Sequence, residues 1–409
     1  MKIAYREIEG RSARFWALAA GLALLAALGL FAAHTMEERG HVVTGMTNQI
    51  VWGMPHVIAV FLIVAASGAL NVASVASVFG KALYRPLAPL SGLLALALLA
   101  GGLAVLVLDL GRPERLIVAM THYNVTSIFA WNVFLYTGFA AVVAVYLWTM
   151  LERRMNAYSR PAGVVALLWR LLLTTGTGSI FGFLVARETY DSALLAPLFI
   201  ALSFAYGLAI YLLTLLATYR ATGRPLGDTV LVRLARLLAI LVAAVLYFVA
   251  LFHVTNLYFA QRREVERFLL LDGGEHTWLF WLGQVLAGGV VPLALLFHPR
   301  LGRSPRAIAV AAALVVLGGL AQMYVMIIGG QAYPLALLPG MEVASSFYDG
   351  VVHSYAPSAP ELMLGGGGVA IAALVVLFAV KLLPFLPEGL DDARVAALEA
   401  PSGPALAAT

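Results

Sequence analysis

The sequence contains no cysteine and has few charged residues. Charged residues make up 11% of its 409 residues, and cysteine is absent. Without cysteine, the chain cannot itself hold iron–sulfur clusters, thiolate zinc sites or disulfides. A soluble domain has about 25% charged residues, so the composition argues against an ordinary soluble fold. Redox chemistry in this chain would therefore need an organic carrier, a haem or a partner subunit.

The sequence is instead rich in apolar residues: 62% of its residues are hydrophobic. Ten apolar runs reach the roughly 20 residues that a helix needs to cross a bilayer core of about 30 Å. Because lipid offers no hydrogen-bonding partners to the backbone, we expect these runs to be helices. The fold class predicted is an all-α polytopic membrane protein with about ten transmembrane helices. The runs lie near 15–34, 51–79, 86–108, 125–150, 163–186, 192–218, 234–258, 277–297, 307–328 and 361–386.

The distribution of basic residues predicts the orientation of these helices. With the N-terminus in the cytoplasm, nineteen of the 26 Lys and Arg residues, Arg170 among them, are assigned to the cytoplasmic side. Positive residues concentrate in cytoplasmic loops, so we expect ten spans with both termini cytoplasmic in a bacterial inner membrane. The first apolar run is too long for a cleaved signal peptide and is predicted to be a retained helix. The seven outside residues are Arg39, Arg112, Arg115, Arg187, Arg262, Arg263 and Arg267.

Side chains that could transfer protons or bind a ligand lie mostly at the outer ends of the predicted helices. Ionisable groups at a helix boundary inside apolar sequence are costly unless they are paired or face a cavity. Charges within the loops, such as Arg262, Arg263 and Glu264, are interpreted as solvated. Few acids occupy mid-membrane positions, so a continuous proton path across the bilayer is not evident. Seven of the eight histidines are on this side: His34, His41, His56, His122, His253, His276 and His353.

The most specific local motif joins the third and fourth apolar runs. Asp109-Leu110-Gly111-Arg112-Pro113 ends one helix, and His122-Tyr123-Asn124-Val125-Thr126-Ser127 begins the next, with Trp131 and Asn132 one or two turns further on. Asp109 and Arg112 can pair at the helix break. An acid, a base, amide donors and an aromatic wall suit a ring that exchanges protons as it exchanges electrons. A capped helix turn with an Asp–Arg pair remains the simpler alternative.

At these residues the sequence resembles the NrfD-type, or polysulfide-reductase membrane-subunit, family. The string 109–113 followed by 122–127 matches that family's signature, although Asp109 stands where other members carry His. Further matches are the segment from Gly182 to Arg187 continuing through 197–207, and Ile328-Gly329-Gly330-Gln331. The resemblance covers roughly residues 50–385. Together with the extra first helix and Gly53-Met54-Pro55-His56, the sequence is most similar to the DsrP-type subunit of sulfur-metabolism complexes.

The resemblance implies the membrane subunit of a respiratory redox complex that binds menaquinone or ubiquinone near the periplasmic face. It implies no haem or metal in this chain, and electron exchange with a periplasmic ferredoxin-like iron–sulfur subunit. It also implies two four-helix bundles: 1–50 is a helix and loop, 51–190 the first, quinone-side bundle, 191–330 the second, and 331–386 a periplasmic loop and last helix. The Ala/Pro-rich residues 387–409 are expected to be a disordered cytoplasmic tail.

Several residues are candidates for a quinone site, and each has a simpler interpretation. His56 could be merely solvated, Arg187 and Glu188 could form an ion pair of no consequence, and His253 could hydrogen bond with Asn256. Haem ligation by His56 and His253 is a further alternative. The catalytic candidates are Asp109, His122 and His56. The quinone-binding candidates are Arg112, Asn124, Ser127, Trp131, Arg187, Glu188, His253 and Gln331.

Two other functional classes stay open. A secondary transporter can also consist of paired helical bundles, but it usually has discontinuous helices and a site at the midplane. The scarcity of midplane ionisable residues favours the redox subunit. The remaining alternative is a passive assembly anchor whose quinone site has been lost.

Overall fold

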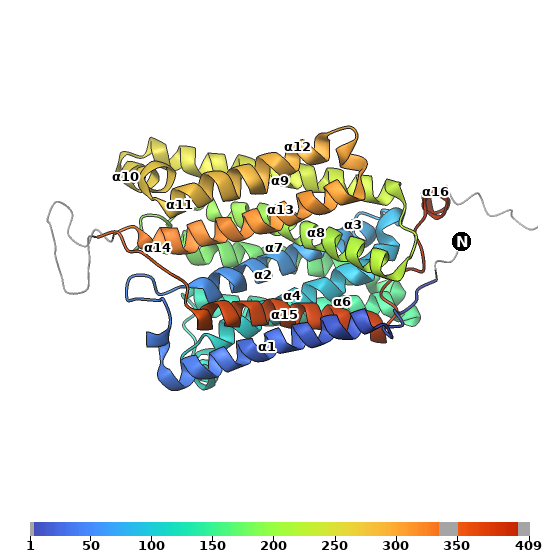
Figure 1. Cartoon of the computed structure of the whole chain (residues 1–409), viewed down its shortest axis with the longest axis horizontal. Coiled ribbons are helices and arrows are strands. Elements are labelled where there is room, and N and C mark those ends of the chain that lie inside the picture. Colours follow the sequence, from blue (N-terminus) through green and yellow to red (C-terminus); the bar gives the residue numbers. More distant parts are fainter. Residues whose placement is uncertain (1–3, 335–350, 400–409) are drawn as a thin grey trace, which may run out of the picture.

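The computed structural model describes residues 4–334 and 351–399, and within these ranges it contains helices and two isolated β-bridges. Ten segments of the described chain are long and apolar enough to span a membrane, which confirms the predicted number (Figure 1). The main helices are α1 (Ala13–Arg39), α2 (Met54–Ala69), α3 (Asn71–Ser77), α4 (Ala88–Leu108), α6 (Ile128–Leu151), α7 (Ser159–Gly182), α8 (Leu195–Thr222), α9 (Asp228–Tyr258), α12 (Val291–Phe297), α13 (Pro305–Tyr324) and α15 (Ala359–Leu382). The short helices are α5 (Leu116–Thr121), α10 (Arg263–Arg267), α11 (Glu275–Trp278), α14 (Gly330–Ala332) and α16 (Asp392–Glu399).

Two of the ten spans depart from a regular α-helix. The eighth span continues from α11 through a π-helical segment, η7 (Leu279–Val290), into α12, and the ninth passes from α13 through the π-helical η9 (Val325–Gly329) into α14. π-Helical turns are rare in proteins, and those that occur are often found at functional sites. They disturb the regular backbone hydrogen bonding of the helix. The second span is interrupted at Leu70, between α2 and α3.

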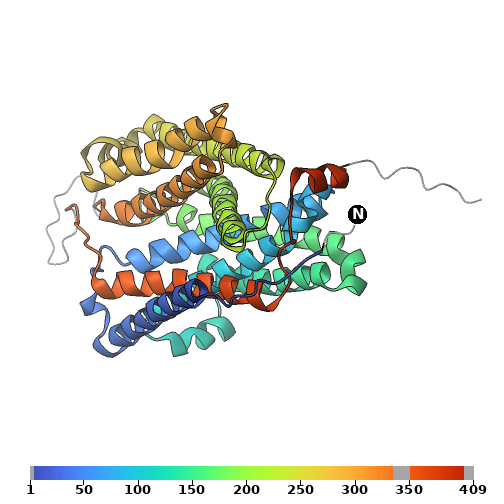
Figure 2. The same cartoon turned by 45° about the vertical axis from the view of Figure 1, so that its right-hand side comes forward.

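The long helices run side by side in two groups (Figures 1 and 2). One group, which we call the first bundle, contains α2 with α3, α4, α6 and α7, and the other, the second bundle, contains α8, α9, η7 with α12, and α13. The helices α1 and α15 pack against each other, and α15 also packs against α2 and α4. We call the end of the molecule that carries α10, α11 and α14 the outer end (Figure 1).

The two groups meet where α2 crosses α8. A Cβ atom on Gly68 would lie 1.6 Å from the backbone oxygen of Ser203, and one on Gly207 would lie 2.1 Å from the carbonyl carbon of Gly68. Small residues allow two membrane helices to approach backbone to backbone. The span that contains α2 is the most enclosed of the ten, with 94% of its most apolar stretch buried. The crossing therefore fixes the position of α2 inside the molecule.

One basic residue that the sequence placed on the cytoplasmic side lies elsewhere. Arg170 is near the middle of α7 and only 3% exposed. Its Nη1 donates to the carbonyl oxygen of Ser67 at 3.2 Å and to Oδ1 of Asn71 at 2.8 Å, and its guanidinium lies 4.9 Å from the centre of the Phe204 ring. The polar partners described for this buried cation are thus neutral. The assignment of Arg170 to the cytoplasmic side is therefore wrong. It was made because an arginine in an apolar run is ordinarily found at the end of the run.

The C-terminal segment is ordered as far as it is described. Backbone bonds join Glu388 to Ala4 and Leu390 to Pro225, and Asp392 accepts a hydrogen bond from the Thr229 amide. The expectation of a disordered tail from residue 387 is therefore wrong for 387–399, and residues 400–409 lie outside the described chain. The sequence signal failed because the ordering comes from two buried apolar side chains within a polar stretch, Leu390 and Val395.

Candidate functional site

An acid and a base meet where the outer ends of α2 and α4 lie together. The helix α4 ends at Leu108, and Asp109 caps it with its amide bonded to the Val105 carbonyl. The helix α2 begins after Gly53 and carries His56 in its first turn. Because α2 and α4 pack along each other in opposite directions, the last residue of one meets the first turn of the other.

Asp109 is flanked by two imidazoles. The Nδ1 of His56 lies 3.0 Å from Oδ2 of Asp109, and the Nε2 of His41 lies 3.7 Å from Oδ1. The same His41 nitrogen lies 2.9 Å from the backbone oxygen of Asp109. The Asp109 side chain is 2% exposed, whereas those of His56 and His41 are 21% and 35% exposed. A buried carboxylate thus has one histidine on each side, and the side chains of both histidines are partly exposed at the surface of the molecule.

This cluster has unused hydrogen-bonding capacity. Among the described residues, neither carboxylate oxygen of Asp109 has a well-aligned hydrogen-bond donor, and the buried Nδ1 of His56 has no hydrogen-bond partner. The 3.0 Å contact between Nδ1 and Oδ2 does not have the orientation of a hydrogen bond. Buried polar atoms in native proteins are almost always hydrogen bonded. An unpaired acid and base at the end of an apolar bundle therefore fit a ligand that presents hydroxyl or carbonyl oxygens.

Aromatic rings form a wall beside His56. The centre of the Trp52 ring lies 6.2 Å from those of His56 and Phe129 and 5.7 Å from that of Phe181. These distances are typical of packed aromatic side chains. Trp131, by contrast, is 52% exposed and donates its indole N–H to the Val125 carbonyl. Trp52, which was not among the sequence candidates, is the tryptophan next to the acid–base cluster.

Gln331 and Arg187 hold the segment that carries Trp52. The side-chain oxygen of Gln331 accepts the amides of Val51 and Trp52, each at 3.0 Å, and its amide nitrogen donates to the Trp52 carbonyl at 2.9 Å. Arg187 donates to the carbonyl oxygens of Gln331 and Gln49 at 3.0 and 2.6 Å. Burial lowers the pKa of Arg187. Both residues were candidates for direct binding, and the structure places them against the backbone behind Trp52.

A second support comes from the start of α15. Glu361 is fully buried, and its carboxylate accepts the amides of Gly45 and Ser358, both at 2.8 Å. The Tyr355 hydroxyl donates to Glu361 at 2.5 Å and accepts the Met54 amide at 2.7 Å. Burial, followed by this bond to Glu361, raises the pKa of Tyr355, so the hydroxyl keeps its proton. The turn that carries His56 is thereby tied to the last transmembrane helix.

Other candidates of the sequence motif lie on the surface connection between α4 and α6. Arg112, His122 and Asn124 are exposed. His122 is 3.0 Å from the Thr121 hydroxyl, and the side chain of Asn124 accepts from the amide and hydroxyl of Thr126. Within the described residues Asp109 makes ion-pair contacts with the two histidines and none with Arg112. The expected Asp109–Arg112 pair is therefore absent, because the carboxylate points toward α2. Ser127, the residue before α6, is half-buried, and Glu188 is exposed.

A second polar cluster lies at the outer end of α9, away from Asp109. Glu266 is fully buried and accepts from His253 Nδ1 at 2.6 Å and from Asn256 at 2.8 Å. Arg262 donates to Asn256 at 3.1 Å and to the side chain of Asp191 at 3.2 Å. His253 and Asn256 therefore share a carboxylate instead of bonding to each other. Arg262, which was interpreted as a solvated loop charge, is instead only 22% exposed in its side chain.

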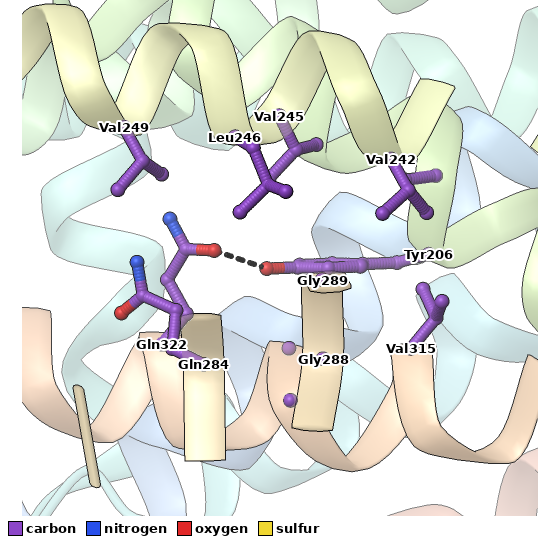
Figure 3. Close-up of a pocket in the computed structure, with 13 residues that line it drawn as sticks. Tyr206, Val242, Val245, Leu246, Val249, Gln284, Gly288, Gly289, Val315 and Gln322 are labelled. Carbon is purple, nitrogen blue, oxygen red and sulfur yellow. Dashed lines mark hydrogen bonds between the residues drawn. The ribbon is translucent and has the colours of Figure 1, made fainter. Parts of the chain in front are cut away.

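The interior of the second bundle contains small cavities that do not reach Asp109. One lies between α8, α9, η7 and α13, where Tyr206 donates to Gln322 at 2.9 Å and Gln284 faces the same space (Figure 3). A neighbouring cavity shares Gln284 and Gln322 and extends to His253. Within the described ranges, no group of three or more His, Asp or Glu side chains is arranged to hold a metal ion.

The fold and site define a polytopic helical membrane protein with an acid–base pair at one end of its first bundle. The chain belongs to the polysulphide reductase NrfD family, which it matches over residues 42–335. It is 31% identical to the Hdr-like menaquinol oxidoreductase integral membrane subunit of Archaeoglobus fulgidus, over 95% of this chain and 98% of that protein. It is 29% identical to a putative dimethyl sulfoxide reductase membrane subunit of Halobacterium salinarum, over 92% of each. It is 26% identical to protein NrfD of Escherichia coli, over 65% of this chain and 90% of that protein.

Proposed function

We propose that this chain is the quinone-reactive membrane subunit of a respiratory redox complex. The observation that carries the proposal is the buried Asp109, which has no aligned hydrogen-bond donor in the part of the chain that the structure describes and lies 3.0 Å from His56 beside the Trp52 wall. A menaquinol or ubiquinol ring offers hydroxyl protons to such a pair and an apolar face to the indole. The names of its relatives, one a menaquinol oxidoreductase subunit, support the same class.

Each residue of the site has a proposed role in quinol oxidation or quinone reduction. Oxidation of a quinol releases two electrons and two protons, and reduction of a quinone takes them up. His56, whose Nδ1 lies beside Asp109, would accept or return a hydroxyl proton on Nε2. Asp109 would hold His56 in orientation and stabilise its cationic form, as a carboxylate beside a catalytic imidazole does. Trp52 would position the ring, and Gln331 and Arg187 would hold Trp52.

The partner in this proposal is a periplasmic, ferredoxin-like iron–sulfur subunit. Electrons leave the quinone at the outer end, so an acceptor docked there would lie close to the site. The complex would serve sulfur-compound metabolism, as the resemblance of the sequence to DsrP-type subunits implies. The chain would lie in a bacterial inner membrane, with the outer end in the periplasm.

A quinone-extraction experiment tests this function. We expect the purified complex to contain bound menaquinone or ubiquinone, and to transfer electrons between added quinol and an iron–sulfur subunit that purifies with it. We also expect the isolated chain to show no Soret absorption, because His56 and His253 belong to different bundles and each contacts its own carboxylate. An assembled complex that exchanges no electrons with any quinol would refute the proposal.

The proposed orientation has its own test. A reporter fused after Arg160 or Arg224 should be active as a cytoplasmic fusion, and one after Arg267 or Ser354 as a periplasmic fusion. The physical reason is the excess of Lys and Arg on the side that carries both termini. Cytoplasmic activity from the fusion after Ser354 would contradict this orientation, and the fusions after Arg160 and Arg224 control for expression of the reporter.

A further inference from the structure

The Asp109 carboxylate has a histidine on each of its two oxygens, and only one of these histidines belongs to a membrane helix. His56 lies in the first turn of α2, beside the Trp52 wall. His41 lies in the short 3₁₀ turn His41–Val43 that follows α1 and precedes α2, outside the membrane-spanning segments. The buried carboxylate is therefore in contact with the bundle on one side and with a surface turn on the other.

The His41 ring is held in place by its neighbours. Its Nε2 lies 2.9 Å from the Asp109 carbonyl oxygen, and the carbonyl oxygen of His41 accepts the amide and hydroxyl of Thr44 at 3.0 and 2.6 Å. The ring packs against Gly111, where a Cβ would lie 3.4 Å from both its Cε1 and Nδ1 atoms. With 35% of its side chain exposed, His41 is an ordered imidazole that contacts both the buried carboxylate and the surroundings.

Of the two histidines that contact Asp109, His41 has the more exposed side chain, and the other ionisable groups near these three residues have contacts of their own. The helix α2 contributes His56, and α4 contributes Asp109 itself. Near the end of α1, Glu38 contacts His34 at 3.3 Å, and from α15 Glu361 is bonded to Gly45, Ser358 and Tyr355. Asp109 makes no ion-pair contact with Arg112 among the described residues.

We propose that His41 exchanges protons between Asp109 and the outer aqueous phase, so that the quinone site is connected to water through a His56–Asp109–His41 relay. The proposal rests on the proposed quinone function of the same site. Protons would then be released or taken up on the outer side of the membrane only, because all three residues lie at the outer end.

The relay balances when it is followed atom by atom. Quinol oxidation sends two electrons, one at a time, to the iron–sulfur acceptor of the partner subunit and releases two protons. Each proton passes from a quinol hydroxyl to Nε2 of His56, and the Nδ1 proton of His56 passes to Oδ2 of Asp109. The Asp109 carboxyl group then rotates and passes this proton to Nε2 of His41, and the Nδ1 proton of His41 leaves to water. Each passage leaves both imidazoles with their proton on Nε2 in place of Nδ1, so a ring flip or proton exchange with water restores both tautomers before the next proton follows. After two passages and two such resets, all three side chains have regained their starting protonation.

The contact distances suit a relay that is gated by the His41 ring. When Nε2 of His41 carries a proton, it donates to the Asp109 carbonyl at 2.9 Å. When that nitrogen is bare it loses this bond, and the ring needs to move by less than an ångström to shorten its 3.7 Å distance to Oδ1. A histidine suits this task because its imidazole can accept a proton on one ring nitrogen and release a proton from the other.

The test compares His41→Ala and His41→Gln in the assembled complex, with quinol oxidation measured from pH 5.5 to 8.5 with and without added imidazole. Loss of a proton-transfer group typically costs about 10²–10⁴ in rate. We expect both variants to be slowed by about 10²-fold, to lose the wild-type pH profile, and to regain rate with imidazole in His41→Ala. Glutamine can still donate to the Asp109 carbonyl but cannot carry a proton. His34→Ala, which removes another exposed histidine of the outer end, should keep the wild-type rate.

The outcomes separate this inference from the proposed function. A wild-type rate in His41→Ala, a wild-type rate in His41→Gln, or slowing that imidazole does not relieve would each overturn the role of His41. The proposed function would survive these results, provided that the wild-type complex oxidises quinol. If the wild-type complex itself shows no quinol oxidation, the proposed function fails and the relay fails with it.

Discussion

Replacing Asp109 with asparagine should slow quinol oxidation by the assembled complex about 10²–10⁴-fold, the usual cost of removing a proton-transfer group. Asparagine has nearly the same shape but cannot accept a proton from His56 or stabilise its cationic form. Assembly should be unaffected, because within residues 4–334 and 351–399 the carboxylate has no aligned donor whose hydrogen bond would be lost. The measurement is the steady-state rate with a soluble quinol analogue, normalised to the amount of complex.

Asp272→Asn provides the matched control for this variant. Asp272 is also near the outer end, but its side chain is 56% exposed and pairs with Arg267 at the surface. An exposed ion pair contributes little, so this variant should keep the wild-type rate and level. If Asp109→Asn were to oxidise quinol as fast as Asp272→Asn, the site would have to lie elsewhere in the chain.

The second large effect is expected at the crossing of the two bundles. Gly68→Leu places a side chain where the backbone oxygen of Ser203 already lies, 1.6 Å from the new Cβ. Overpacking of a core commonly costs about 1–3 kcal/mol, and the cost should be larger here because backbone atoms of a second helix must move. We expect almost no folded chain in the membrane, as measured by monodisperse elution after detergent extraction.

Gly21→Leu is the control, since it makes the same change in another membrane helix. Apart from the backbone of α1 itself, no atom of the described residues lies within 4 Å of the Cβ that this substitution adds in α1. It should therefore leave the yield of folded chain unchanged. Normal yield from Gly68→Leu would mean that α2 and α8 do not cross as closely as described.

Most of the fold could be predicted from the sequence, because the bilayer permits so few structures. A chain that crosses lipid must satisfy its backbone bonds within each segment, so apolar length alone predicts the helices. The interruption at Leu70 and the π-helical segments η7 and η9 could not be predicted, since they depend on how helices pack. Arg170 shows the same limit, because its partners in α2 and α3 are about a hundred residues away in sequence.

The candidate site could be predicted only in part. Asp109 and His56 were both identified, but their contact depends on α2 and α4 packing in opposite directions, which no local pattern encodes. Glu361 was missed for a different reason. The string from Ser358 to Glu361 forms an ordinary capping box, in which the acid helps to begin α15, and this local role hides its bonds to Gly45 and Tyr355. Local motifs also failed for Arg112, which follows Asp109 closely but faces the surface.

Arg170 has a consequence for how well the first bundle insulates the membrane. Arginine keeps its charge in proteins, and the described polar partners of this one are neutral groups. Coulomb repulsion is strong in a medium of low dielectric constant, so a fixed cation near the middle of α7 raises the energy of any hydronium or metal ion that enters the bundle. Positive charges in membrane channels exclude protons and cations in this way. Turnover of quinone at one end of the bundle would thus leave the electrical potential across the membrane undissipated.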